Sequence, residues 1–202
     1  MIQPGPALID RTEARAAYLT VRLVSLAEVM QLVSKSPTPG VGLAGIQAAL
    51  NAFAGVGVAR HAAALGDQVT PVRLAAVLTD VLEAIEDSPL PDCEWGAMAD
   101  VLGEDMLAKL VGASITSMHR YRSRDRLTPD HIAARLHVVT LIVADLAGSY
   151  NDFGIRRWFG RQRSVLSHRS PAELLTGDWK PDDEATRQVR ALAAALLAPL
   201  AA

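Results

Sequence analysis

Apolar residues recur at three- and four-residue intervals along most of this 202-residue chain, and few segments alternate strictly between apolar and polar positions. The best-marked helix follows Thr70, a capping residue, with Pro71 at the first helical position and an apolar stripe that continues to about Asp87. The same spacing predicts further helices over 12–33, 43–53, 58–65, 95–102, 129–146 and 181–197. The pattern therefore predicts an all-α protein.

Clusters of Pro, Gly and Asp divide this helical pattern into parts. Ser36-Pro-Thr-Pro-Gly40 ends the first long stripe, and Asp87-Ser-Pro-Leu-Pro-Asp92 is the strongest boundary signal in the chain. Ser170-Pro-Ala-Glu173 is a capping box that opens a short helix, which Gly177 ends. We expect a helical N-terminal region at 1–90, a central domain at 91–148 and a small helical C-terminal domain at 149–202.

The central region contains a candidate helix-turn-helix, EDMLAKLVGASITSMHRYRSR, at 104–124. Glu104 to Val111 forms the first helix, and Gly112 tolerates the positive φ that a sharp turn demands. A second helix from about Ser114 is expected to turn Ile115 and Met118 toward the core. Such units place their second helix in the major groove of DNA, so the motif predicts a DNA-binding domain.

The second helix and the residues after it are rich in arginine. Thr116, Ser117 and Arg120 share one side of the predicted helix and are our candidates for base contacts. Ser114, Arg122 and Arg124 are the candidates for phosphate contacts. Two other interpretations remain open, an ordinary helical corner with a solvated basic face and a scaffold whose helix-turn-helix has lost DNA binding.

The charge distribution favours the DNA-binding interpretation. Residues 96–170 hold eleven Lys/Arg and seven Asp/Glu, a formal charge of +4, whereas the remainder holds nine and fifteen, a charge of −6. The single cysteine, Cys93, rules out a disulfide framework within one chain. The N-terminus lacks the pattern of a signal peptide, and charges interrupt every long apolar run, so we expect a cytoplasmic protein without a membrane span.

No motif in the sequence indicates an enzyme, a metal site or a cofactor. Gly40-Val-Gly42-Leu-Ala-Gly45 has the spacing of a dinucleotide-binding loop, but no strand precedes it, so a nucleotide-using enzyme is the least favoured alternative. The histidines lack metal-ligand spacing; His131 and His137, for example, are six residues apart. Ser167-His168 lacks the glycine elbow of a nucleophilic serine.

The C-terminal part resembles a known family. Asn151-Asp-Phe-Gly-Ile-Arg-Arg-Trp158-Phe, followed by Ser170-Pro-Ala-Glu-Leu-Leu-Thr-Gly177-Asp, is similar to the toxin-binding domain of Xre/MbcA/ParS-type antitoxins, which follows an Xre-like helix-turn-helix. The resemblance covers roughly residues 96–200. Residues 1–90 depart from the family, whose members are commonly shorter.

The resemblance implies an antitoxin of a type II toxin-antitoxin system. Such a protein neutralises a RES-domain toxin, which consumes NAD, and represses its own promoter, usually as an oligomer. The implied partner-binding residues are Trp158, Phe159, Ser170, Leu174, Leu175 and Trp179. The alternative is a helix-turn-helix transcriptional regulator with no toxin partner, in which residues 1–90 serve dimerisation or ligand sensing.

Overall fold

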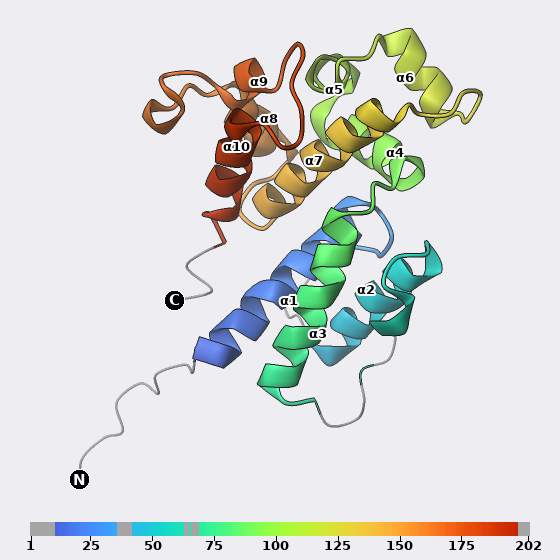
Figure 1. Cartoon of the computed structure of the whole chain (residues 1–202), viewed down its shortest axis with the longest axis vertical. Coiled ribbons are helices and arrows are strands. Elements are labelled where there is room, and N and C mark those ends of the chain that lie inside the picture. Colours follow the sequence, from blue (N-terminus) through green and yellow to red (C-terminus); the bar gives the residue numbers. More distant parts are fainter. Residues whose placement is uncertain (1–10, 36–41, 63–64, 66–68, 198–202) are drawn as a thin grey trace.

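A computed structural model describes residues 11–35, 42–62, 65 and 69–197 of the chain. These residues form ten α-helices and two short 3₁₀ helices, without a strand among them, and so confirm the all-α prediction (Figure 1). The first elements are α1 (Arg11–Val29), α2 (Leu43–Gly55), η1 (Arg60–Ala62) and α3 (Pro71–Glu86). Next come α4 (Pro91–Leu102), α5 (Glu104–Val111), α6 (Ile115–Arg122) and α7 (Asp130–Ala147). The chain continues through α8 (Asp152–Gly160), η2 (Ser164–Leu166), α9 (Pro171–Leu174) and α10 (Glu184–Ala194).

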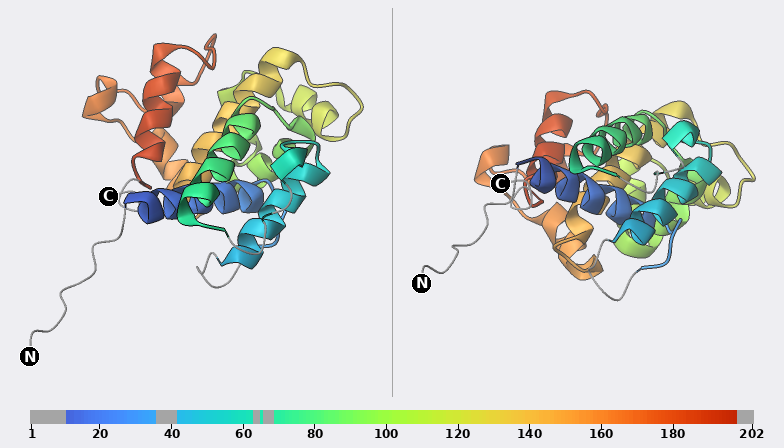
Figure 2. Two further views of the ribbon diagram at one scale, coloured as in Figure 1. Left: turned by 60° about the horizontal axis from the view of Figure 1, so that its bottom comes forward. Right: turned by 90° about the horizontal axis from the view of Figure 1, so that it is seen from below.

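Helix α7 is the centre of the packing. It contacts α1, α4, α5, α8 and α10, and 14 of its 18 residues are buried. Helices α1 to α3 form one group, below α7 in Figure 1, and α4, α5, α8 and α10 pack on its other sides (Figures 1 and 2). A helix that is apolar on nearly all sides is stable in water only when its neighbours cover it. Helix α7 is covered by α1 on one side and by α4, α5, α8 and α10 on the others.

Local capping explains several of the helix ends. The Thr70 hydroxyl accepts a hydrogen bond from the amide of Arg73, and Pro71 occupies the first turn of α3, as predicted. The capping box of α9 is also confirmed, because the Ser170 hydroxyl accepts from the Glu173 amide and the Glu173 carboxylate accepts from the Ser170 amide. At α7 the prediction of Pro129 as the first helical residue was one position off, since Pro129 is the N-cap.

Three other predicted helices have different bounds. α1 ends at Val29 rather than Val33, because Gln31 adopts a φ of 58° and the next two amides bond back to the carbonyl of Ala27. α4 begins at Pro91 rather than Trp95. The last helix runs from Glu184 to Ala194 rather than from Pro181 to Leu197.

Part of the sequence-based prediction lies outside the described residues. Of the helix expected over 58–65, the structure describes 58–62 and 65 and shows only η1 within them. The break at 36–40 lies outside as well, and so does the first glycine of the dinucleotide-like motif. Gly42 is the N-cap of α2 and Gly45 lies within that helix.

One buried apolar cluster runs through the described helices, from Ala16 in α1 to Ala193 in α10. It therefore crosses both of the boundaries expected at 90/91 and 148/149. Among the described residues, no single helix has the length and apolar character to cross a bilayer. Only α7 and α8 taken together pass that test of length and composition, and the pair is bent by 119°.

A network of four charged side chains also connects the helices around α7. The Nε of Arg22 in α1 donates to Oδ1 of Asp145 in α7 at 3.1 Å, and its Nη2 donates to Oε1 of Glu86 in α3 at 3.1 Å. The other oxygen of Glu86 accepts from Nη2 of Arg190 in α10 at 3.0 Å. Arg22 and Asp145 are largely buried, so solvent screens these contacts only in part.

Candidate nucleic-acid interface

The α5–α6 unit consists of two eight-residue helices joined by a turn at 112–114. Gly112 adopts the left-handed conformation, with φ 75° and ψ 33°, and its amide bonds to the carbonyl of Ala108. Ser114 then caps α6, because its hydroxyl accepts from the amide of Ser117 at 3.1 Å. The turn glycine and the start of the second helix thus lie where the sequence predicted them. The capping role of Ser114 was not predicted, and its phosphate contact stays a prediction.

An aromatic pair fixes α6 on the core. Tyr121 stacks on Trp95 of α4 with ring centroids 5.8 Å apart and an interplanar angle of 26°. The indole Nε1 of Trp95 donates to the Thr128 hydroxyl at 2.9 Å, which ties α4 to the connection between α6 and α7. Met118 is buried as expected, whereas Ile115 is 40% exposed, so its predicted core position was wrong. Tyr121, not Ile115, completes the inner face of α6.

The opposite face of α6 carries the predicted base-contact residues. Thr116 and Arg120 are exposed, and Ser117 is half-buried beside Ser114. Thr116 and Arg120 are four residues apart, and Ser117 and Arg120 three, so all three side chains occupy one face. The structure brings these three candidates together, while their contact with bases stays a prediction.

Carboxylates of α4 and α5 partly neutralise the basic residues around α6. Nε2 of His119 lies 2.9 Å from Oε2 of Glu104 in α5, and it donates a hydrogen bond to this carboxylate oxygen when it carries a proton. Its other oxygen lies 3.9 Å from Arg122, and Arg124 lies 3.3 Å from Asp92. All these partners are well exposed, so each pair contributes at most about 1 kcal/mol and opens readily for a competing phosphate.

Arg120 differs from its basic neighbours on α6. It is exposed and forms no ion pair with any residue in the described part of the chain. Arg126 instead lies over the Tyr121 ring, 5.8 Å from its centroid, and so belongs to the support of α6. The exposed face thus has a guanidinium at its centre that no carboxylate engages within the described residues.

The predicted partner-binding residues lie mostly inside the chain. Trp158, Phe159, Leu175 and Trp179 are core residues, and Ser170 is also buried, with 4% exposure. Only Leu174 is half-buried and reaches the surface. In this conformation the five buried side chains cannot touch a partner, so any direct contact has to come from residues around them, and binding itself stays a prediction.

Trp179 connects the C-terminal segment to the α5–α6 unit. Its indole Nε1 donates to the carbonyl of Leu110, near the end of α5, at 2.9 Å. Its own carbonyl accepts from Nε of Arg135 in α7 at 2.8 Å, and the Arg135 guanidinium lies 5.4 Å from the indole centroid. Arg135 also reaches Asp178 at 3.0 Å. The sequence offered only a weak signal for this contact, an arginine within the apolar stripe of α7.

Exposed residues do surround the buried tryptophans. The loop after α8 folds back on itself through an isolated bridge between Arg163 and Arg169, with positive φ at Ser167 and His168. Val165 at its tip is 69% exposed. A groove of about 590 Å³ lies beside it, between this loop, α5 and α9. The residues that line it are Lys109, Gly160, Gln162, Arg169, Ser170, Ala172, Glu173 and Thr176.

A buried histidine–carboxylate pair between α4 and α7 was not predicted from the sequence. Nδ1 of His137 in α7 is 2.5 Å from Oε1 of Glu94 in α4, and both residues are almost fully buried. Their other polar atoms, Glu94 Oε2 and His137 Nε2, have no hydrogen-bond partner in the part of the chain that the structure describes. The pair connects α4 with α7. Within the described residues no group of three potential metal ligands comes together.

Comparisons with known proteins do not extend these observations. No family model matches the chain, and neither curated proteins nor solved structures give a match. The functional interpretation therefore rests on the geometry described above and on the resemblance seen in the sequence.

Proposed function

We propose that the chain is a transcriptional regulator that binds DNA through the α5–α6 unit. The observation that carries this proposal is the exposed face of α6, where Arg120 stands beside Thr116 and Ser117 without an ion-pair partner in the described part of the chain. A guanidinium held in this way suits bidentate contact with a guanine, which is worth about 1–3 kcal/mol of discrimination. The weakly paired Arg122 and Arg124 flank it and suit phosphate contact.

Binding of the chain's own promoter fragment, followed by fluorescence anisotropy, tests this proposal. Arg120→Ala should weaken specific binding about tenfold or more, because it removes a base contact. Arg124→Ala should instead lower the salt dependence by about one counterion, because it removes a phosphate contact. Arg15→Ala, an exposed arginine on α1, is the matched control. Equal affinities of the wild type and the Arg120→Ala, Arg122→Ala double variant would exclude the α5–α6 unit as the reading head.

We further propose that this regulator is an antitoxin, and that it acts as an oligomer which neutralises a RES-domain toxin and represses its own promoter. The support is the resemblance of 151–178 to the toxin-binding domain, together with the capping box at Ser170. Because the motif tryptophans are buried, we assign the contact to the surface that they support. That surface includes Val165, Leu174 and the groove beside Lys109.

Growth rescue tests the antitoxin proposal. A host that expresses the neighbouring open reading frame should stop growing, and co-expression of this chain should restore growth. Val165→Asp should reduce the rescue, because it places a charge at the exposed tip of the loop without disturbing the core. Val72→Asp, at a similarly exposed valine of α3, is the control. If Val165→Asp and the control rescue equally well, the loop is not the contact.

The alternative function is a helix-turn-helix regulator without a toxin. The observation that favours it is the packing of α1 on α7, because α7 also contacts α5 of the α5–α6 unit. In this case the neighbouring open reading frame has no effect on growth, while promoter binding persists. The two proposals therefore differ in the growth experiment and agree in the anisotropy experiment.

A further inference from the structure

The backbone carbonyls at the end of α5 find their hydrogen bonds in two different ways. The last four carbonyls of an α-helix have no partner within the helix. In α5 the carbonyl of Ala108 accepts from the amides of Gly112 and Ala113, which closes the turn locally. The carbonyl of Leu110 accepts instead from the indole Nε1 of Trp179, 69 positions away, at 2.9 Å. Leu110 and Trp179 are 1% and 4% exposed, so loss of the indole N–H would leave a buried carbonyl without this donor.

Trp179 is itself fixed on α7. Its carbonyl accepts from Nε of Arg135 at 2.8 Å, and the Arg135 guanidinium lies 5.4 Å from the indole centroid. The preceding backbone lies close to the turn between α5 and α6, because a Cβ built on Gly112 would lie 3.9 Å from the carbonyl oxygen of Gly177. The segment around Trp179 thus packs against α7 and against this turn, and the indole connects it to α5.

Helix α6 is consequently held at both of its ends. Near its C-terminal end, Tyr121 stacks on Trp95 of α4. Its N-terminal end follows the turn directly and carries Thr116 and Ser117. In helix-turn-helix units the N-terminal residues of the second helix contact the base edges. A change at the end of α5 therefore acts on the part of α6 that we assign to base contacts.

We propose that Trp179 is a positioning residue for DNA recognition, because its indole N–H fixes the end of α5 and with it the first turn of α6. This inference rests on the proposed function of the α5–α6 unit. Hydrogen bonds to base edges require a narrow range of distance and angle. The attraction between an arginine and a phosphate falls slowly with distance, so it tolerates a small displacement. Loss of the indole N–H should therefore reduce sequence discrimination more than general attraction to DNA.

Trp179→Phe tests this role, since phenylalanine keeps an aromatic ring beside Arg135 and lacks the N–H. Fluorescence anisotropy measures its affinity for the promoter fragment and for a scrambled duplex of equal length. The promoter affinity should fall about three- to tenfold, the change expected from one buried hydrogen bond. The affinity for the scrambled duplex should stay within about twofold, because phosphate contacts carry it. Destabilisation of the whole chain lowers both affinities by the same factor, so their ratio reports positioning alone.

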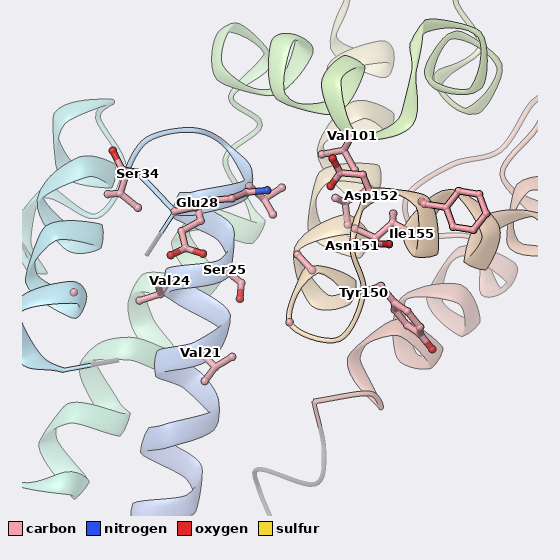
Figure 3. A pocket seen from close by; sticks show the side chains of 18 of the residues that line it. Val21, Val24, Ser25, Glu28, Ser34, Val101, Tyr150, Asn151, Asp152 and Ile155 are labelled. Atoms are coloured by element: carbon pink, nitrogen blue, oxygen red, sulfur yellow. The ribbon is translucent and has the colours of Figure 1, made fainter. Parts of the chain in front are cut away.

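Val24→Ala is the control for a general loss of stability. Val24 belongs to α1 and packs against the core. It lines a cleft of about 1050 Å³ between α1 and the corner of α7 and α8, and Figure 3 shows it on the α1 side. This variant loses apolar contacts but changes no contact of Trp179 or of the turn, so the ratio of the two affinities should equal that of the wild type.

The possible outcomes separate this inference from the function on which it rests. If Trp179→Phe keeps the ratio of the wild type, Trp179 has no positioning role, whereas DNA recognition by α6 stands. If the wild type itself does not prefer the promoter, the proposed function fails and the inference fails with it. If Trp179→Phe does not fold, 3-benzothienylalanine at position 179 decides in the same assay, because it keeps the bicyclic shape and has sulfur in place of the N–H.

Discussion

At the scale of single residues, Gly112 has the strictest requirement in the α5–α6 unit. Its φ of 75° is a conformation that other L-residues adopt at a cost of roughly 1–2 kcal/mol. A Cβ at this position would also lie 2.7 Å from Nη1 of Arg135, which holds the C-terminal segment through Trp179. Backbone conformation and space therefore both demand glycine here.

We predict that Gly112→Ala lowers the free energy of unfolding by at least about 1 kcal/mol, because the alanine is strained and displaces Arg135. Gly96→Ala is the matched control, since Gly96 lies within α4 and, beyond the backbone of its own helix, no atom of the described residues comes within 4 Å of the added Cβ. That variant should gain about 0.5–1 kcal/mol from the higher helix propensity of alanine. Urea unfolding measures both changes, and a Gly112→Ala variant as stable as the wild type would contradict the strain.

The sequence predicted local features of the site better than distant ones. The turn at Gly112 and the start of the second helix near Ser114 depend on the next few residues, and both were predicted from local spacing. Ile115 was misplaced because Tyr121 takes the inner position, and the partner of Tyr121 is Trp95, far away in the chain. The burial of Trp179 was missed for the same reason, because its hydrogen-bond partner, Leu110, lies 69 positions away.

At the scale of elements, α6 is too short to be stable on its own, because an isolated helix of eight residues gains little from its few internal hydrogen bonds. Its N-terminal end depends on the Ser114 cap and its inner face on Met118 and Tyr121. The cap and the inner face together fix the orientation of α6, and therefore of the exposed face that carries Arg120.

We predict that Ser114→Ala lowers the free energy of unfolding by about 1 kcal/mol, the usual cost of removing an N-cap. DNA binding should weaken as well, since the first turn of α6 carries Thr116 and Ser117. Ser123→Ala, at the C-terminal end of the same helix, removes only exposed hydrogen bonds and should change stability by less than about 0.5 kcal/mol. Urea unfolding measures both, and equal losses in the two variants would argue against a special role of the cap.

Element ends were predictable where a local signal marks them. Thr70-Pro71 and Ser170-Pro171 begin their helices as expected, because cap and proline act within one turn. The end of α1 was not predictable, because the apolar stripe continues to Val33 while the backbone turns at Gln31. Apolar spacing alone cannot distinguish a residue that continues a helix from one that packs after the helix has ended.

At the scale of the whole molecule, the Arg22–Glu86–Arg190 contacts make stability depend on pH. Burial raises the pKa of Glu86, but the guanidinium groups of Arg190 and Arg22 outweigh it, so the pKa falls below its ordinary value of 4.5. A carboxyl with a lowered pKa in the folded state stabilises the fold above pH 4.5, and this contribution is lost as the pH falls through the lowered value.

We predict that Glu86→Gln costs about 1–2 kcal/mol at neutral pH, and that the difference from the wild type shrinks below pH 4.5. Urea unfolding at a series of pH values measures this. Asp145→Asn is the contrasting variant, because burial raises the pKa of Asp145 more than Arg22 lowers it. The contribution of Asp145 is present in acid and lost as the pH rises, so its difference from the wild type should change in the opposite direction. If the effect of Glu86→Gln on the free energy of unfolding did not change with pH, the lowered pKa of Glu86 would be refuted.

The nearly complete burial of α7 has a consequence for how its amide hydrogens exchange with solvent. The buried side chains of α7 lie between 132 and 146, and the surrounding helices have to separate before the backbone of this stretch meets water, so its amides should exchange only through global unfolding. Helix α6 is a short surface helix, so its amides should exchange through local opening and therefore much faster. Native-state hydrogen exchange measures both rates. Slow exchange in α7 would report the stability of the entire chain, whereas exchange in α6 would report how freely the proposed reading head detaches from its support.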